Sequence, residues 1–404
     1  MRLRKMKLME KPVIKAARRT GLVNEYYFST KLAEIARMRQ QGLDVISLGI
    51  GSPDMPPAAI VIEELCRNAS GIGNHGYQSY RGIPALRGAF AAWYLKYFGV
   101  TLDPETEILP LIGSKEGIMH ISMAFLDPGD EVLVPDPGYP TYNAATTLAG
   151  GIARVYDLKE GNGWLPDLES IEASGVEKVK IMWINYPHMP TGARATPELF
   201  QHLVDFARRH SILLCNDNPY SFIMNRDHLS LLSVPGARDV ALELNSLSKS
   251  HNMAGWRIGM VAGNSGFIND VLKVKSNMDS GMFQPLQAAA AKALSAPDEW
   301  YEQLNEAYRR RRNIAAEIMN ALSCTFDPKQ SGLFLWGKIP ADCSDSVALT
   351  EDLLQKNHVF ITPGSVFGDN GRRFIRISLC ATEELLEKAL KRITSDNHSE
   401  VNLN

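Results

Sequence analysis

The stretch DVALELNSLSKSHNMAGWRIGMVAG spans residues 239–263 and decides the fold. It holds two nearly continuous apolar runs, 239–246 and 259–263, separated by a polar segment that contains Lys249. Runs without polar alternation are typical of strands that are buried on both faces. The stretch therefore predicts two strands of a covered sheet, with a lysine just beyond the end of the first.

Similar apolar runs begin at about residue 105, and amphipathic stretches lie between them. The runs are EVLVP at 131–135, VKIMWINY at 179–186 and ILLCND at 212–217, and PELFQHLVDFARR at 197–209 has the period of a helix. This alternation of strand and helix predicts an α/β fold with a parallel sheet and right-handed crossovers.

The flanking regions have a different pattern. Residues 28–41 predict an early helix, 285–322 a long helix and 382–394 a last helix, and short strands are predicted at 334–339 and 373–379. We expect these segments to form a smaller α+β domain from both ends of the chain.

The composition of the 404-residue chain is that of an ordinary globular protein, with 45% hydrophobic and 22% charged residues. A formal net charge of -2 excludes a bulk positive field for nucleic acid or an anionic membrane. No apolar run approaches the roughly 18 residues needed to span a bilayer. The five cysteines form no C-x-x-C pair, so we expect no metal site and a reducing, cytoplasmic location. The basic N-terminus lacks an apolar segment and predicts a solvated arm.

Two motifs do not carry chemistry. The glycines of GIGNHG at 71–76 match G-x-G-x-x-G, but an amphipathic helix precedes them where a dinucleotide site needs a strand. The four arginines at 309–312 point all around a helix axis, which predicts a solvated helix surface.

Three strand ends combine residues that suit a phosphorylated aldehyde cofactor. Lys249 follows one strand, and Asp217 ends another with Tyr220 three residues later. Gly113 and Ser114 open a predicted helix whose N-terminus favours an anion. Taken singly, each feature is more often a surface lysine, an N-cap or a helix cap. Because ligands bind beyond the carboxyl ends of strands in such sheets, the set together indicates pyridoxal phosphate.

The chain resembles the class I/II aminotransferases of the aspartate aminotransferase fold type. Within them it is closest to the branch with LL-diaminopimelate and broad-specificity amino-acid aminotransferases. The matching stretches run in the family's order from about 47 to 378: LGIGSPD, YQSYRGIPALR, LIGSKEGI, DPGYPTY, NYPHMPTG, NDNPYSF, SLSKSHNMAGWRIG, NMDSGMFQPLQ and FIRIS.

The resemblance implies a large domain at 46–288 with a mostly parallel seven-stranded sheet flanked by helices, and a small α+β domain at 289–404. The arm and helix at 1–45 would pack with the small domain. It also implies an aminotransferase that moves the amino group of an L-amino acid to a 2-oxo acid by a ping-pong mechanism, as a homodimer with shared active sites. Its partners would be amino acid and 2-oxo acid substrates, and we expect no nucleic acid, no membrane and no metal.

The resemblance assigns a role to each matching site residue. Lys249 would form the Schiff base with pyridoxal 5′-phosphate and shuttle the proton, Asp217 would keep the ring nitrogen protonated, and Tyr220 would hydrogen-bond the ring 3′ oxygen. Tyr139 would stack on the ring, and Ser114, Lys115, Ser246, Ser248 and Arg257 would bind the phosphate, with Tyr80 of the neighbouring subunit. Arg376 would bind the substrate α-carboxylate, and Gly51 and Asn185 would line the substrate side, Asn185 also contacting the cofactor.

One position departs from the family pattern. Met189 stands where the family usually has the asparagine of Asn-Pro-Thr-Gly, which hydrogen-bonds the ring 3′ oxygen. A thioether is a poor replacement for an amide. We expect one lost hydrogen bond and a raised pKa of the cofactor–lysine linkage, without loss of activity.

Two other functions share these motifs. A β-lyase or another lyase of this fold type would keep the cofactor and change the reaction. A non-catalytic sensor is less favoured, because the 47 residues before LGIGSPD are too few for a DNA-binding domain with its linker. The amino donor stays open among diaminopimelate, methionine, aromatic and alanine-type substrates.

Overall fold

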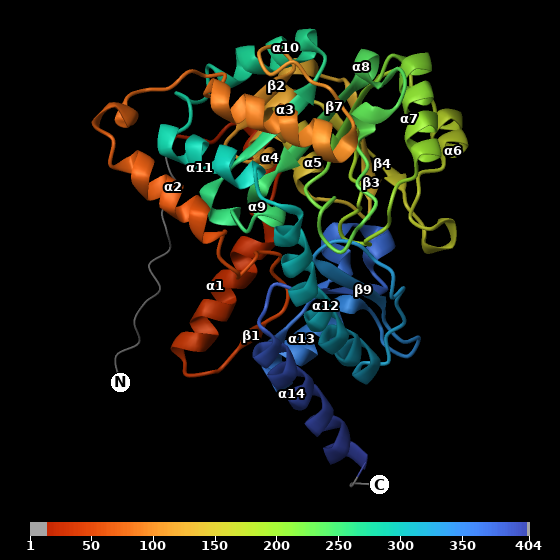
Figure 1. The fold of residues 1–404 in the computed structure, drawn as a ribbon. Helices are drawn as coiled ribbons and strands as arrows, with labels where there is room; N and C mark the ends of the chain where they lie inside the picture. The colour runs from red at the N-terminus through yellow and green to blue at the C-terminus, as the bar shows by residue number, and fades with distance from the viewer. Residues whose placement is uncertain (1–13, 402–404) are drawn as a thin grey trace.

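A seven-stranded sheet forms the centre of the larger part of the molecule (Figure 1). The computed structural model describes residues 14–401. The sheet order is β2-β8-β7-β6-β5-β3-β4. Strands β3 to β7 pair in parallel, whereas β8 runs antiparallel to both neighbours. The strands are β2 (Ile108–Leu111), β3 (Glu131–Asp136), β4 (Ile152–Asp157), β5 (Val179–Ile184), β6 (Leu213–Asp217), β7 (Ala241–Ser246) and β8 (Gly259–Gly263).

Helices cover both faces of this sheet, which explains its continuous apolar runs. Along β5, Ile181 and Trp183 face one core while Met182 and Ile184 face the other. One core includes side chains of α2, α3, α7 and α11, and the other includes side chains of α4, α5 and α10. The helices of this part are α2 (Ala59–Ala69), α3 (Pro84–Phe98), α4 (Ser114–Phe125), α5 (Thr141–Ala149), α6 (Leu168–Ala173), α7 (Pro197–His210), α8 (Ala237–Val240), α9 (Leu247–Ser250), α10 (Ser265–Lys275) and α11 (Gln284–Leu294).

A three-stranded antiparallel sheet with its own apolar core forms the smaller part. Its order is β11-β12-β9, and its core includes Trp336 stacked on Phe374 at 5.1 Å. Its strands are β9 (Phe334–Lys338), β11 (Thr362–Pro363) and β12 (Phe374–Ser378), and its helices are α12 (Asp298–Ala321), α13 (Ser346–Asp352) and α14 (Glu383–Val401). The predicted α/β class with a small α+β domain is confirmed.

The N-terminal segment packs against this smaller part (Figure 1). Helix α1 (Tyr27–Gln40) buries Ile35 and Met38 against Leu354 and Phe360. Strand β1 (Ile46–Ser47) pairs in parallel with β10 (Val359–Phe360). The boundaries predicted at 45/46 and 288/289 stay a proposal, and the predicted basic arm lies largely outside the described residues.

Short helical turns complete the described chain. The 3-10 turns are η1 (Arg18–Gly21), η2 (Ile72–His75), η3 (Glu160–Asn162), η4 (Leu231–Ser233), η5 (Ala254–Trp256), η7 (Gly364–Phe367) and η8 (Asp369–Gly371), and η6 (Leu353–Asn357) is a π-helix. None of the helices in the described part is long and apolar enough to cross a membrane.

Two sequence expectations need correction. The predicted long helix at 285–322 is two helices, α11 and α12, because Pro297 stands directly before Asp298 and interrupts the pattern. The apolar run at 239–246 begins as the end of α8, and its strand starts only at Ala241.

Candidate active site

A cavity of about 410 Å³ lies where the carboxyl ends of the parallel strands face the small sheet. Its walls come from the ends of β6 and β7, the start of α4, and β12. The lining includes the predicted residues Gly51, Ser114, Lys115, Tyr139, Asn185, Asp217, Tyr220, Ser246, Ser248, Lys249, Arg257 and Arg376. The fold thus brings together residues that are spread over more than 300 positions of the sequence.

Lys249 lies in the short helix α9, directly after β7. Its Nζ donates a hydrogen bond to the carbonyl oxygen of Gly51. Burial lowers the pKa of Lys249, with a partly opposing effect from Cys380. A lowered pKa increases the fraction of neutral amine, which is the nucleophilic form.

Asp217 is the last residue of β6, and only one of its two carboxylate oxygens has a hydrogen-bond partner among the described residues. The Tyr142 hydroxyl donates to Oδ2 at 3.1 Å, while Oδ1 is buried without a hydrogen-bond partner in the described structure. Burial raises the pKa of Asp217 to about 7, although the Tyr142 hydrogen bond and the charge of Lys249 act in the opposite direction. An unpaired buried carboxylate oxygen is costly unless a cationic donor faces it. The protonated ring nitrogen of pyridoxal phosphate is such a donor.

Cations and hydroxyls gather at the first turn of α4. Lys115 and Arg257 have no salt bridge to a carboxylate among the described residues, and burial and the charge of Arg257 lower the pKa of Lys115. Arg257 donates from Nη1 to Ser248 Oγ at 3.4 Å. Two cations without a counterion, beside a helix N-terminus, fit a phosphate.

Gly113 makes this arrangement possible. Its φ is +84°, and a Cβ atom there would lie 2.0 Å from Nη2 of Arg257. A residue with a side chain would therefore displace the arginine from the start of α4.

Arg376 lies on β12 at the opposite end of the cavity and is 3% exposed. Its Nη2 donates to the Gly49 carbonyl at 2.8 Å, and its Cζ lies 3.8 Å from the ring centroid of Phe334. Burial lowers the pKa of Arg376 to about 10, so the group remains cationic at neutral pH. No carboxylate of the described residues forms a salt bridge with it, which leaves it available for an anionic substrate.

Asn185 lines the cavity, but its amide is engaged with the protein. Its Nδ2 donates to the Asp217 carbonyl, and its Oδ1 accepts from the Met189 amide at 2.8 Å. The Asn185 side chain therefore links the end of β6 to the segment that carries Met189. Gly51 is equally constrained, because a Cβ there would lie 2.3 Å from the Phe334 ring.

Tyr80 does not line this cavity. It is 43% exposed, in the loop between η2 and α3. Its predicted contact with the phosphate of a neighbouring subunit stays a proposal.

Sequence reasoning missed several aromatic residues of the cavity wall. They are Tyr26, Phe28, Tyr142, Phe334 and Phe367. Tyr142 lies within the quoted DPGYPTY stretch, three residues after the assigned Tyr139, so a closer reading of that motif could have found it. The ring of Tyr26 lies 4.2 Å from Nζ of Lys115, although nothing in the sequence links the two positions.

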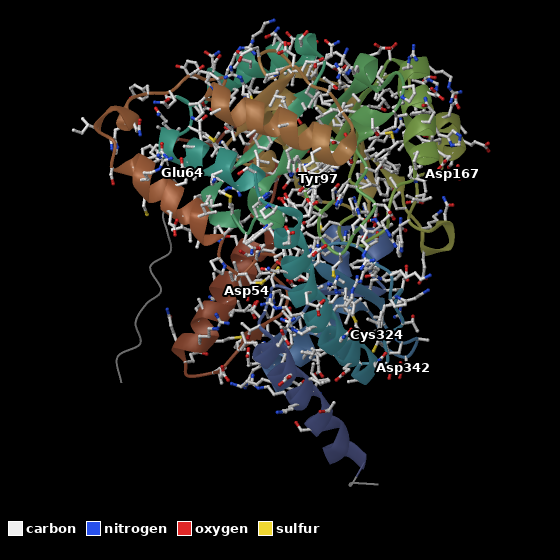
Figure 2. All side chains as sticks on the ribbon, viewed as in Figure 1. Asp54, Glu64, Tyr97, Asp167, Cys324 and Asp342 are labelled. Carbon is white, nitrogen blue, oxygen red and sulfur yellow. The ribbon has the colours of Figure 1, made fainter. Side chains whose placement is uncertain are left out.

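The expected solvated surface at 309–312 is wrong for Arg311. This side chain is buried and binds Asp54 in a fork, with Nη1–Oδ1 and Nη2–Oδ2 distances of 2.7 and 2.8 Å (Asp54 is labelled in Figure 2). The pair joins α12 to the loop that carries Gly51. A helix period alone could not show it, because the partner is 257 residues away.

Comparison with known proteins places this geometry in a family. The sequence profile described as aminotransferase class I and II matches residues 43–393. The LL-diaminopimelate aminotransferase of Desulforudis audaxviator is 45% identical over 379 residues, which are 93% of this chain and 96% of that protein. The enzyme of the same name from Moorella thermoacetica is 42% identical and covers 93% and 97%.

Solved structures agree with the sequence relatives. Substrate-bound BacF from Bacillus subtilis superposes with a TM-score of 0.92 at 34% identity, covering 95% of this chain and 98% of that one. Thermus thermophilus aspartate aminotransferase with maleate superposes with a TM-score of 0.88 at 29% identity, covering 95% and 99%. The chain belongs to the class I and II aminotransferases, and it is a pyridoxal-phosphate-dependent aminotransferase of fold type I.

Proposed function

We propose that this aminotransferase takes LL-diaminopimelate as its amino donor. The observation that carries the proposal is its 45% identity, over almost the whole chain, with an LL-diaminopimelate aminotransferase. The site supports an L-amino acid donor, because the buried Arg376 has no carboxylate partner among the described residues and its planar fork matches an α-carboxylate.

The residues of the chain divide the chemistry among them. Pyridoxal phosphate, when bound, supplies an electron sink next to the amino group of the substrate. Lys115, Ser114, Ser246, Ser248 and Arg257 would hold the phosphate end, with Tyr139 stacked on the ring and Tyr220 and Asn185 at its edge. The open Oδ1 of Asp217 would face the ring nitrogen and keep its proton in place.

Proton transfer belongs to Lys249. Burial favours the neutral amine, and the hydrogen bond to Gly51 places Nζ at the substrate side of the cavity. The same amine would remove the α-proton from the donor and later return a proton to the cofactor side. The acceptor 2-oxo acid would then use the same Arg376 in a second half-reaction, which gives ping-pong kinetics.

Amino donors tested on the purified enzyme decide the substrate. LL-diaminopimelate is compared with methionine, phenylalanine and alanine, with 2-oxoglutarate or pyruvate as acceptor. We expect a kcat/KM for LL-diaminopimelate at least about tenfold above the others, as a difference in side-chain fit gives. Meso-diaminopimelate serves as the stereochemical control. Efficient transfer from methionine or phenylalanine, with none from LL-diaminopimelate, would overturn the substrate. Release of ammonia and pyruvate in place of amino transfer would instead indicate a lyase.

We also propose a homodimer in which each subunit completes the other's site. Apolar side chains are exposed around the loop that carries Tyr80: Ile72 is 97% exposed and Tyr77 is 93% exposed. Phe283 is 41% exposed on the same face, and its ring centroid lies 5.7 Å from that of His75. Exposed apolar groups that gather on one face are typical of an interface.

Complementation tests the shared site. Tyr80→Phe and Lys249→Ala each weaken or abolish activity as homodimers. A mixed dimer restores one complete site, so coexpression should give more activity than either variant alone. Additive activity without recovery would show that Tyr80 serves its own subunit. A cytoplasmic location is the corresponding cellular expectation, and fractionation tests it.

A further inference from the structure

Asp136, the last residue of β3, reaches across to a loop of the smaller part. Its side chain is 8% exposed. Its Oδ2 accepts from the Asp369 amide at 2.9 Å, and its Oδ1 accepts from the Asn370 amide at 3.1 Å. Both donors lie in residues 367–371, which are the middle of the segment between β11 and β12 and are called the 367–371 loop. One carboxylate of the large sheet thus uses both oxygens to hold a loop of the small sheet.

Further hydrogen bonds join the same two segments. The Asn370 side chain donates to the Asp136 carbonyl at 3.1 Å, and the Gly138 amide donates to the Phe367 carbonyl at 2.8 Å. No cation of the described residues pairs with Asp136, whose charged neighbours Asp157 and Asp369 are also acidic. The ionised carboxylate therefore depends on the amides of the 367–371 loop.

The 367–371 loop has a glycine where its backbone lies against the Asp136 carboxylate. Gly368 has a φ of +136°, and a Cβ atom there would lie 2.1 Å from Oδ1 of Asp136. Only glycine leaves room for the carboxylate at this distance. The contact can therefore be disturbed from either side.

Phe367 connects the loop to the substrate end of the cavity. It is 4% exposed, lines the cavity, and its ring centroid lies 4.5 Å from Cζ of Arg376. A guanidinium stacked on an aromatic face is held by that face. Nη2 and Nη1 of Arg376 donate to the Gly49 carbonyl and the Met189 sulfur, but its Nε has no hydrogen-bond partner among the described residues, so the rings add to the support of its plane.

We propose that Asp136 is a positioning residue for substrate binding: it fixes the 367–371 loop, which holds Phe367 against Arg376. The proposal rests on the role of Arg376 in the proposed function. It predicts an effect on binding of the amino acid and the 2-oxo acid, and none on capture of the cofactor phosphate at the other end of the cavity.

Steady-state kinetics of Asp136→Asn test the proposal. The amide keeps the size of the side chain but cannot accept from both loop amides. We expect KM for the amino donor to rise about tenfold, the low end of the range for one hydrogen bond to a charged group, with a smaller change in kcat. The visible absorption of the bound cofactor should stay unchanged. Gly368→Ala should raise KM in the same way.

Asp345→Asn is the matched control. Asp345 also accepts from a backbone amide of the small part, that of Ala348 at 2.8 Å, but it does so at the exposed start of α13. We expect KM to be unchanged. A KM that rises equally in this control, or that stays normal in both folded test variants, overturns the proposal.

A double variant separates this proposal from the role of Arg376. If Asp136 acts through Arg376, Asp136→Asn should add little to the KM of Arg376→Lys. Full additivity overturns the positioning role. A normal KM in Arg376→Lys alone would instead overturn the proposed role of the arginine.

Discussion

The sulfur of Met189 accepts a hydrogen bond from Nη1 of Arg376 at 3.2 Å. Met189 thus takes the place of the usual asparagine and contacts the arginine at the substrate end. A thioether is a weak acceptor and has no N–H to donate, so it serves neither the ring 3′ oxygen nor a substrate carboxylate.

Met189→Asn should restore a hydrogen bond to the ring 3′ oxygen. Because that bond favours the charged form of the oxygen, we expect the pKa of the cofactor–lysine linkage to fall by about one unit. Absorbance against pH measures it. An identical titration in the two proteins would show that Met189 does not change the pKa of this linkage.

Lys249→Ala should abolish both turnover and the visible band of the bound cofactor, because the amine is the attachment point and the proton carrier. Lys273→Ala is the control, since Lys273 is an exposed lysine paired with Asp270. Retention of both signals in Lys249→Ala would refute the assignment of this lysine.

Arg376→Lys should weaken the binding of the α-carboxylate. An ammonium cannot make the two parallel hydrogen bonds of a guanidinium, so we expect a loss of about 1.5–3 kcal/mol, or roughly 10–150-fold in kcat/KM. Donor titration at fixed acceptor concentration measures it. The cofactor spectrum should be normal, and a change there would indicate a wider structural effect.

Removal of the cofactor should make stability depend on pH through Asp217. Its pKa is raised to about 7 in the fold, so the folded state holds a proton that the unfolded chain has lost. The stability of the cofactor-free protein should therefore fall as pH rises from about 4 to about 7. In Asp217→Asn this fall should be smaller, while turnover drops on the order of 10²-fold or more. Thermal unfolding across pH measures the first effect, and parallel profiles of the two cofactor-free proteins would contradict it.

Arg311→Ala should destabilise the protein, because it leaves Asp54 without its partner next to the buried side of α12. Breaking such a pair costs about 3 kcal/mol. Arg309→Ala is the matched control on the same helix, since Arg309 pairs with Glu306 at the surface and should change stability by less than about 0.5 kcal/mol. Equal denaturation midpoints for the two variants would refute a structural role for the Arg311–Asp54 pair.

Much of the fold follows from local sequence patterns. The buried strands around Trp183, Cys215 and Leu244 lack polar alternation, and this lack is visible in the sequence because both faces of the sheet are covered. The direction of β8 was not visible, since an apolar run has the same composition in either direction. The break before α12 depended on one proline within a long helical pattern.

The site was predictable where motif residues stand at strand ends. Asp217 and Lys249 meet in the cavity for that reason, whereas Arg376 lies in the middle of β12 and was assigned from the resemblance of its FIRIS stretch. Contacts between distant segments had no sequence signal: Phe367 touches Arg376, and Arg311 binds Asp54, only after the two parts of the molecule have come together. The order of the residues along the chain gives no hint of such pairs.

The pairing of β1 with β10 has a consequence for synthesis on the ribosome. Thr362 donates to the carbonyl of Gly49, which was translated 313 residues earlier. Strand β1 and the loop that carries Gly49 and Gly51 must therefore wait for nearly the whole chain to emerge before they find their partners, while the helices and strands of the large sheet can assemble first. A chain truncated before residue 359 would lack both β10 and Thr362, so β1 and Gly49 would remain without these partners.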